Sequence, residues 1–300
     1  MRFAAFRTNK GEGLAAADAD GRFHGLFASD PNFPGTLAEL IVGGDAALKA
    51  GAATLLKGEP VDLDAVTLLP PLPRPGKILC VGLNYVDHSL ESGFTPPDYP
   101  TVFVRFPSSL IGHGAPLIRP EASIQLDYEG EMVAVIGKGG RHISKEDALD
   151  HIVGYSIFND GSIRDYQKRT PQWTVGKNFD GTGAFGPVFV TADELPAGCK
   201  GLHIETRLNG KVMQSASTDD MIFDVASLVS ILSAAMTLEA GDIIVSGTPS
   251  GVGVARVPPV FMKAGDICEI ELEGVGVLRN RIEDEKTVTT GLSPATEGAR

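Results

Sequence analysis

The sequence of 300 residues is poor in cysteine and tryptophan and short of positive charge. Its three cysteines, Cys80, Cys199 and Cys268, are odd in number and lie far apart in apolar or strand-like segments. Free buried thiols in a reducing compartment fit this pattern better than disulfides or a cysteine metal cluster. None of the three stands in a sequence typical of a cysteine nucleophile.

Basic residues number 26 against 38 acidic ones, which gives a formal net charge of -12. This charge argues against nucleic acid or an anionic membrane as the partner, because phosphates would meet net repulsion. No run approaches the roughly 20 apolar residues of a membrane span, and residues 1–8 lack the apolar core of a signal peptide. We therefore predict a cytoplasmic protein with a small-molecule partner.

Hydrophobic residues make up 43% of the chain, and 36 glycines and 20 prolines indicate many tight turns between short strands. The fold class that we predict is a β-rich α+β fold. A proline-dense connector at 69–76 predicts a boundary between a small N-terminal domain, residues 1–70, and a main domain, residues 71–285. The polar tail, residues 286–300, is predicted to be mobile.

Short patterns predict the individual elements. We expect N-terminal strands at 2–7, 13–17 and 21–27, followed by a helix at 36–57 that is interrupted at Gly43-Gly44. Further strands are expected at 77–81, 102–106, 132–136, 152–159, 188–191, 203–208, 243–246 and 267–272, with helices at 144–151 and 224–235 and a helix or turn at 84–91. Asn209-Gly210 predicts a hairpin turn, and the glycine-rich stretch 163–185 predicts a functional loop or lid.

Three acids at alternate positions, Asp127, Glu129 and Glu131, lead directly into an apolar run. On an extended strand these side chains point to one face, where their charges repel. A divalent cation would account for them, and Asp160, at the end of a later strand, could supply a further carboxylate. Oxygen ligands without cysteine or histidine favour Mg²⁺, Mn²⁺ or Ca²⁺ over zinc. These residues alone equally allow a solvated edge strand.

Other residues suggest chemistry only weakly when taken singly. His88 and Glu91 share a face if their segment is helical, so the carboxylate could orient a water-activating imidazole, although such pairs are common on surfaces. Lys177, in the glycine-rich loop, could stabilise an enolate or could simply be solvated. Residues 246–253 could cradle a carboxylate or form a plain turn, and no Gly-Lys-Ser/Thr follows them as in a phosphate loop.

Taken together and in order, these segments resemble the fumarylacetoacetate hydrolase family over roughly residues 70–283. The resemblance rests on the following motifs: Lys77–Tyr85 with His88, Asp127–Glu131, Asn159-Asp160, Arg164-Asp165, Gln172-Trp173 with Lys177, Asp220–Phe223 and Gly247–Pro249. It implies a mixed β-sandwich roll for the main domain and a homodimer.

The resemblance also implies roles for individual residues. Glu129, Glu131 and Asp160 would hold Mg²⁺, with Mn²⁺ and Ca²⁺ as alternatives, and Asp127 would be their neighbour. His88, Glu91 and Lys177 would be catalytic. The residues expected to contact substrate are Arg164, Gln167, Thr248, Tyr85 and Arg105. Arg105 stands where many relatives have a lysine, and small residues in the lid predict a roomier or more flexible pocket.

The activity that the resemblance implies is metal-dependent hydrolysis of a carbon–carbon bond in an acylpyruvate or related 2,4-dioxo acid, giving pyruvate and a second acid. The same site serves oxaloacetate decarboxylation and keto–enol or 2-hydroxy-dienedioate isomerisation in this family, and these are alternatives here. A catalytically silent binding protein is a further alternative, against which the presence of His88 and Glu91 argues.

Overall fold

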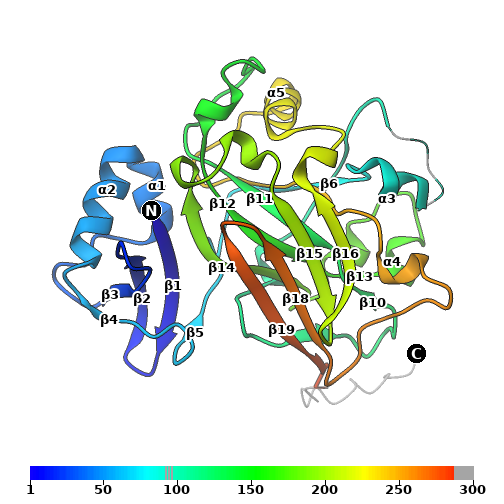
Figure 1. Ribbon diagram of the computed structural model, residues 1–300, viewed down its shortest axis with the longest axis horizontal. Coiled ribbons are helices and arrows are strands. Elements are labelled where there is room, and N and C mark those ends of the chain that lie inside the picture. The colour runs from blue at the N-terminus through cyan, green and yellow to red at the C-terminus, as the bar shows by residue number, and fades with distance from the viewer. Residues whose placement is uncertain (92, 94, 96, 287–300) are drawn as a thin grey trace, which may run out of the picture.

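The central strands of the sheet organise the fold (Figure 1), and nearly all of their residues are buried. The computed structural model describes residues 1–286 except 92, 94 and 96. From residue 287 on, the predicted mobile tail therefore lies outside the described residues. The chain forms one large mixed sheet, a smaller sheet packed against its centre, and few helices. The predicted β-rich α+β class is confirmed.

The large sheet contains twelve strands. In spatial order they are β4 (Glu59–Pro60), β3 (Phe23–Phe27), β2 (Gly11–Ala17), β1 (Arg2–Thr8), β14 (Gly183–Thr191), β12 (Ile152–Asp160), β11 (Gly130–Ile136), β17 (Ile243–Val245), β6 (Ile78–Gly82) and β7 (Thr101–Val104). Two short strands join beside this path: β5 (Thr67–Leu68) pairs with β1, and β8 (Leu110–Ile111) pairs with β14. Neighbours along the path are antiparallel except β17 and β6.

The second sheet runs in the order β16 (Lys211–Ser217), β15 (His203–Leu208), β18 (Ile267–Leu272), β19 (Gly276–Asp284) and β9 (Leu117–Arg119). A separate pair joins β10 (Leu126–Asp127) to β13 (Ser162–Ile163). The α-helices are α1 (Leu37–Val42), α2 (Gly44–Leu55), α3 (Val86–Glu91), α4 (Arg164–Gln167) and α5 (Val225–Ala235). Short 3₁₀ turns are η1 (Pro107–Ser109), η2 (Ala148–His151), η3 (Val175–Lys177), η4 (Ala192–Glu194), η5 (Ala197–Cys199), η6 (Thr218–Asp220) and η7 (Gly253–Ala255).

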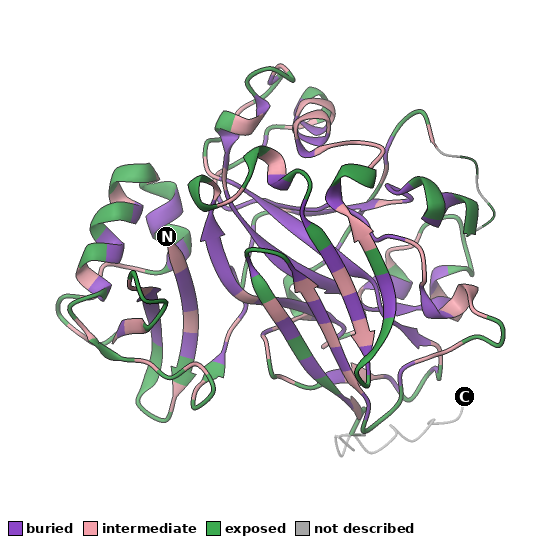
Figure 2. Cartoon of the chain, viewed as in Figure 1, coloured by how far each residue is buried: buried purple, intermediate pink, exposed green. Residues whose placement is uncertain are grey.

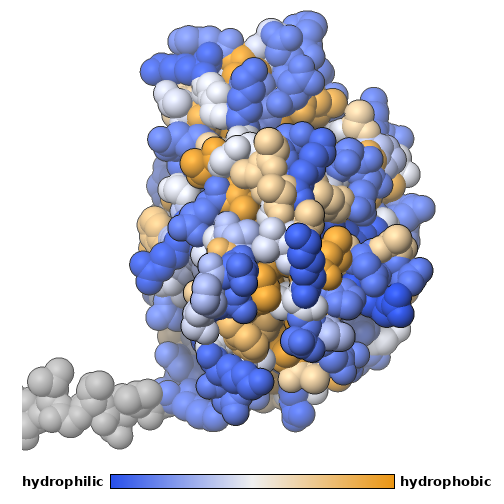
Figure 3. Space-filling model, turned by 90° about the vertical axis from the view of Figure 1, so that its left-hand side faces the viewer, coloured by the Kyte–Doolittle hydropathy of each residue, from blue (hydrophilic) through white to orange (hydrophobic). Residues whose placement is uncertain are grey.

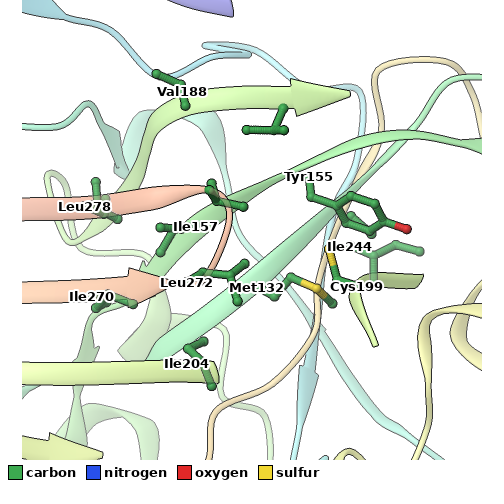
Figure 4. Close-up of a cluster of buried hydrophobic side chains, with 14 of the residues drawn as sticks. Met132, Tyr155, Ile157, Val188, Cys199, Ile204, Ile244, Ile270, Leu272 and Leu278 are labelled. Carbon is green, nitrogen blue, oxygen red and sulfur yellow. The ribbon is translucent and has the colours of Figure 1, made fainter. Parts of the chain in front are cut away.

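Strand β11 divides the interior into two apolar clusters because its side chains alternate between the faces of the large sheet. Met132 packs in the cluster shared with the second sheet, where Ile204 and Ile270 also lie (Figure 4). Val133 belongs to the cluster on the opposite face. All seven residues of β11 are buried, and the central strands are almost entirely buried in Figure 2. The residues at the start of β11 are thus held in a rigid frame.

The N-terminal strands continue the large sheet, since Phe3 in β1 pairs with Phe189 in β14. Helices α1 and α2 lie over these strands, and Leu37 and Leu48 pack in the same cluster as Phe3 (Figure 1). The outer side of this N-terminal part carries mixed hydrophilic and apolar side chains (Figure 3). The proposed division at about residue 70 thus falls inside one hydrogen-bonded sheet.

Several local predictions can now be compared with the structure. The break between α1 and α2 at Gly43-Gly44 is confirmed, and Asn209 and Gly210 both have positive φ, as the predicted hairpin requires. The helix predicted at 144–151 is wrong over its first half: Ser144 and Asp147 hydrogen-bond each other in a turn, and only η2 follows.

None of the described helices has the length and apolar character to cross a bilayer.

Candidate active site

Three buried carboxylates converge where β11 begins and β12 ends. The two strands are antiparallel neighbours, so Asp160 at the end of β12 lies beside Glu129 and Glu131, and the Asp160 amide donates to the Glu129 carbonyl at 2.9 Å. One oxygen from each of the three carboxylates lies within 4.8 Å of the others. The structure therefore brings together the three acids that were predicted to hold a metal.

Asp127 is separate from this group because the predicted continuous strand is interrupted. Strand β10 ends at Asp127 and pairs with β13, whereas β11 begins at Gly130 and pairs with β12. The Asp127 carboxylate accepts hydrogen bonds from Arg164 Nε at 2.8 Å and from the amides of Gly253 and Val254 at 2.8 and 2.9 Å. It ties three segments together and is satisfied without a metal.

Buried cations balance two of the three clustered acids. Lys177 Nζ lies 2.7 Å from Glu129 Oε2 and 2.5 Å from Asp160 Oδ2. Arg164 Nη1 is 2.7 Å from Glu129 Oε1. Burial raises the pKa of the Glu129 carboxyl, but the charges of Lys177 and Arg164 outweigh it and lower that pKa to about 2. Glu129 is therefore held ionised.

Glu131 has no cationic partner among the described residues. Its Oε2 accepts a hydrogen bond from the Gly247 amide at 2.6 Å. Burial raises the pKa of the Glu131 carboxyl well above its ordinary value, and the charges of Asp160 and Glu129 raise it further. A further cation close to Glu131 would relieve this repulsion, so the site has a charge deficit that a metal ion fits.

The chemistry of the donors fits a hard divalent cation. All three side chains offer carboxylate oxygens, which Mg²⁺, Mn²⁺ and Ca²⁺ prefer. Cys80 lies on β6, which β17 separates from β11, and burial raises the pKa of its thiol, so it does not supply a thiolate for a soft metal. The same residues could hold Mg²⁺ or Mn²⁺.

A cavity of about 220 Å³ opens in front of the acids. Most of the predicted site residues line it: His88, Glu91, Glu129, Glu131, Arg164, Gln167, Lys177 and Thr248. Apolar side chains complete the walls, among them Phe103 and Trp173. Trp173 packs against Gly82, where a Cβ atom would come within 2.2 Å of the indole ring. The cavity is thus polar at one end and apolar along its sides, as in many small-molecule sites.

His88 and Glu91 lie together at this cavity on α3. His88 Nδ1 is 3.7 Å from Glu91 Oε2, which is too long for a hydrogen bond but close enough for the carboxylate to influence the ring. The Gly251 amide donates to both oxygens of Glu91, at 2.9 and 3.1 Å. Burial opposes ionisation of Glu91, yet His88 and the Gly251 amide lower its pKa. Glu91 is therefore fixed as an anion beside the imidazole.

Tyr85 and Arg105, two of the predicted substrate contacts, do not line the cavity. The Arg105 guanidinium is buried, with Nη1 2.5 Å from Asp160 Oδ1 and Nη2 2.8 Å from Thr182 Oγ1. The Tyr85 hydroxyl is buried without a hydrogen-bond partner among the described residues, and burial together with the charge of Glu131 raises its pKa. Arg105 thus supports Asp160, and neither residue lines the cavity.

Gln214 and Lys168 are site residues that the sequence reasoning missed. Gln214, on β16, donates to Thr248 Oγ1 at 2.8 Å and accepts from the Gly130 amide at 3.0 Å. Lys168 follows α4 and lines the cavity. No local signal marks either residue, because a hairpin strand and a loop lysine acquire these positions only when distant segments come together.

Comparisons with known proteins agree with this arrangement. The family model described as fumarylacetoacetate (FAA) hydrolase C-terminal matches residues 77–283. The oxaloacetate tautomerase YisK of Bacillus subtilis is 47% identical over 224 residues, which cover 73% of this chain and 74% of that protein.

Two solved structures are similar over nearly the whole chain. A fumarylacetoacetate hydrolase from psychrophilic Exiguobacterium antarcticum has a TM-score of 0.80 at 37% identity, covering 95% of this chain and 100% of that one. A maleylpyruvate hydrolase from Sphingobium sp. SYK-6, in complex with manganese (II) ion and pyruvate, has a TM-score of 0.78 at 28% identity with the same coverage.

Proposed function

This chain belongs to the fumarylacetoacetate hydrolase family, and from that premise we propose that it is a divalent-metal-dependent tautomerase of oxaloacetate or a closely related 2-oxo acid. The observation that carries the proposal is the convergence of Glu129, Glu131 and Asp160 at a cavity that the two glutamates line together with His88 and Lys177. The name of the relative that is 47% identical supports the substrate and the reaction.

Glu129, Glu131 and Asp160 would hold the metal. When bound, a divalent ion supplies Lewis-acid polarisation of the 2-oxo group and stabilises the negative charge of an enolate. His88, oriented by Glu91, is the proposed group that removes and returns the proton on the carbon beside the 2-oxo group. Enol formation then removes one proton from this carbon and adds one to the 2-oxo oxygen, and ketonisation reverses both transfers.

Lys177 is the proposed donor to the substrate oxygen. Its ammonium group has three N–H donors, and Glu129 and Asp160 accept two of them. The third is free to stabilise charge that develops on an enolate oxygen in this largely buried site. Arg164 orders the same region, since its Nη1 also donates to Gln167 Oε1 at 2.8 Å.

Hydrolysis of an acylpyruvate, the activity first predicted from the resemblance, is a second candidate. It is favoured by the pairing of His88 with an anionic Glu91 that two hydrogen bonds from Gly251 hold in place, because the same pair could activate water. The maleylpyruvate hydrolase with bound manganese and pyruvate supports it as well.

A substrate panel separates these activities. The purified protein, stripped of metal and then supplied with Mg²⁺, Mn²⁺ or Ca²⁺, is mixed with oxaloacetate, acetylpyruvate or a 2-hydroxy-dienedioate. Tautomerisation of oxaloacetate, followed by enol absorbance and requiring added metal, is the expected result. Pyruvate and acetate formed from acetylpyruvate would favour the hydrolase instead, and pyruvate with CO₂ from oxaloacetate a decarboxylase. Absence of metal-dependent turnover on every substrate would contradict an enzymatic role.

A further inference from the structure

The cavity has an uneven distribution of positive charge. Arg164 is paired with Asp127 and Glu129, and Lys177 is paired with Glu129 and Asp160. Both cations are buried and both are largely used in balancing acids of the protein itself. Arg164 Nη2, which has no hydrogen-bond partner among the described residues, and the remaining N–H of Lys177 therefore both lie close to the clustered acids, where the 2-oxo acid end of a substrate would bind.

Lys168 differs from these two cations. It is exposed, it lines the same cavity, and its ammonium group has no hydrogen bond or ion pair within the part of the chain that the structure describes. Its backbone amide closes α4 by donating to the Arg164 carbonyl at 3.1 Å, which anchors the base of the side chain. The next residue, Arg169, stacks on the Tyr166 ring at 3.8 Å and does not line the cavity.

We propose that Lys168 determines specificity for dicarboxylic substrates by binding the carboxylate distal to the 2-oxo acid end. This inference rests on the proposed function, in which the 2-oxo acid end lies at Glu129, Glu131 and Asp160. A substrate with its 2-oxo group at these acids extends along the cavity, and the flexible stem of lysine lets its ammonium group reach the far carboxylate. Lys168 is thus a specificity residue, and the proton transfer does not depend on it.

The test measures binding separately from turnover. Calorimetry with the Mg²⁺-loaded protein compares 3,3-difluorooxaloacetate, which cannot enolise, with its 4-methyl ester, which lacks the distal charge. We expect the native protein to bind the diacid about 10-fold more tightly than the ester, because a charged pair at the cavity is worth roughly that factor. Lys168→Met should reduce the preference to within about 2-fold, and Lys168→Arg should retain it.

Arg169→Gln is the matched control, since it removes the same charge one residue away and outside the cavity. It should keep the preference for the diacid. An unchanged preference in Lys168→Met, or an equal loss in Arg169→Gln, would overturn the assignment. Native protein that discriminates between the ligands but does not tautomerise oxaloacetate would overturn the proposed reaction and leave the role of Lys168 intact.

Discussion

The His88 imidazole lies beside the anionic Glu91, at the same cavity that Glu129 and Glu131 line. Glu91 is held by the Gly251 amide, and His88 is close to it without a hydrogen bond at Nδ1. A substrate could close this gap, because catalytic hydrogen bonds often tighten only in the bound complex. The proposed proton transfer therefore depends on His88, whereas metal binding depends on the three clustered carboxylates.

His88→Ala should therefore lower kcat by at least about 100-fold, the lower range for loss of a general acid–base group. The affinity for Mg²⁺ should stay within about 3-fold of native, since the three carboxylates are untouched and none of them is hydrogen-bonded to His88 among the described residues, so His88 is not one of the outer partners that orient metal ligands. Steady-state kinetics and calorimetry on the same preparation check both statements. Native turnover in the variant would remove His88 from the mechanism.

The sequence could predict those site residues that stand in local motifs, but not those whose positions depend on contacts with distant segments. Glu129, Glu131 and Asp160 stand in recognisable motifs, so the sequence alone was enough to find them. The supporting role of Arg105 could not be found in this way, because its place behind Asp160 depends on β7 and β12 belonging to one sheet. Gln214 was missed for the same reason, since its partner Thr248 is far away in sequence.

The N-terminal strands and the strands of the main domain form one sheet, although the composition suggested two separate domains. The proline-dense connector predicts two domains, yet β1 pairs with β14 and Phe3 packs against Phe189 with ring centroids 6.2 Å apart. The apolar pattern with its break at Gly43-Gly44 predicted α1 and α2 well, and the turn signal Asn209-Gly210 predicted the hairpin. Strand order could not be predicted, because it depends on contacts between residues far apart in sequence.

Phe3→Ala tests whether the N-terminal strands and the main sheet unfold together. Phe3 is fully buried, so the variant should lose about 3–5 kcal/mol of unfolding free energy through the cavity that it leaves. Far-ultraviolet circular dichroism and the fluorescence of the single tryptophan, Trp173, should report the same denaturation midpoint. A shift confined to one probe would instead support two independently stable domains divided near residue 70.

For the molecule as a whole, the excess of acidic residues has its strongest electrostatic effect at Glu131. The chain carries a net charge of -12, but most of its acids are solvated or paired, whereas Glu131 is buried beside two other carboxylates. The predicted cytoplasmic location and homodimer stay predictions. The central claim is that the three clustered acids form a divalent-metal site on which activity depends.

Calorimetric titration of Mg²⁺ into native protein and into Glu131→Gln tests this claim most directly. Asp180→Asn is the control, because it removes one acidic charge from the glycine-rich loop that carries Lys177, at a residue outside the cluster. The account predicts one ion per native chain, native affinity in the control, and at least about 100-fold weaker binding in Glu131→Gln, since a lost ligand costs more than an altered outer group. Equal Mg²⁺ affinity in Glu131→Gln and native protein would contradict the account.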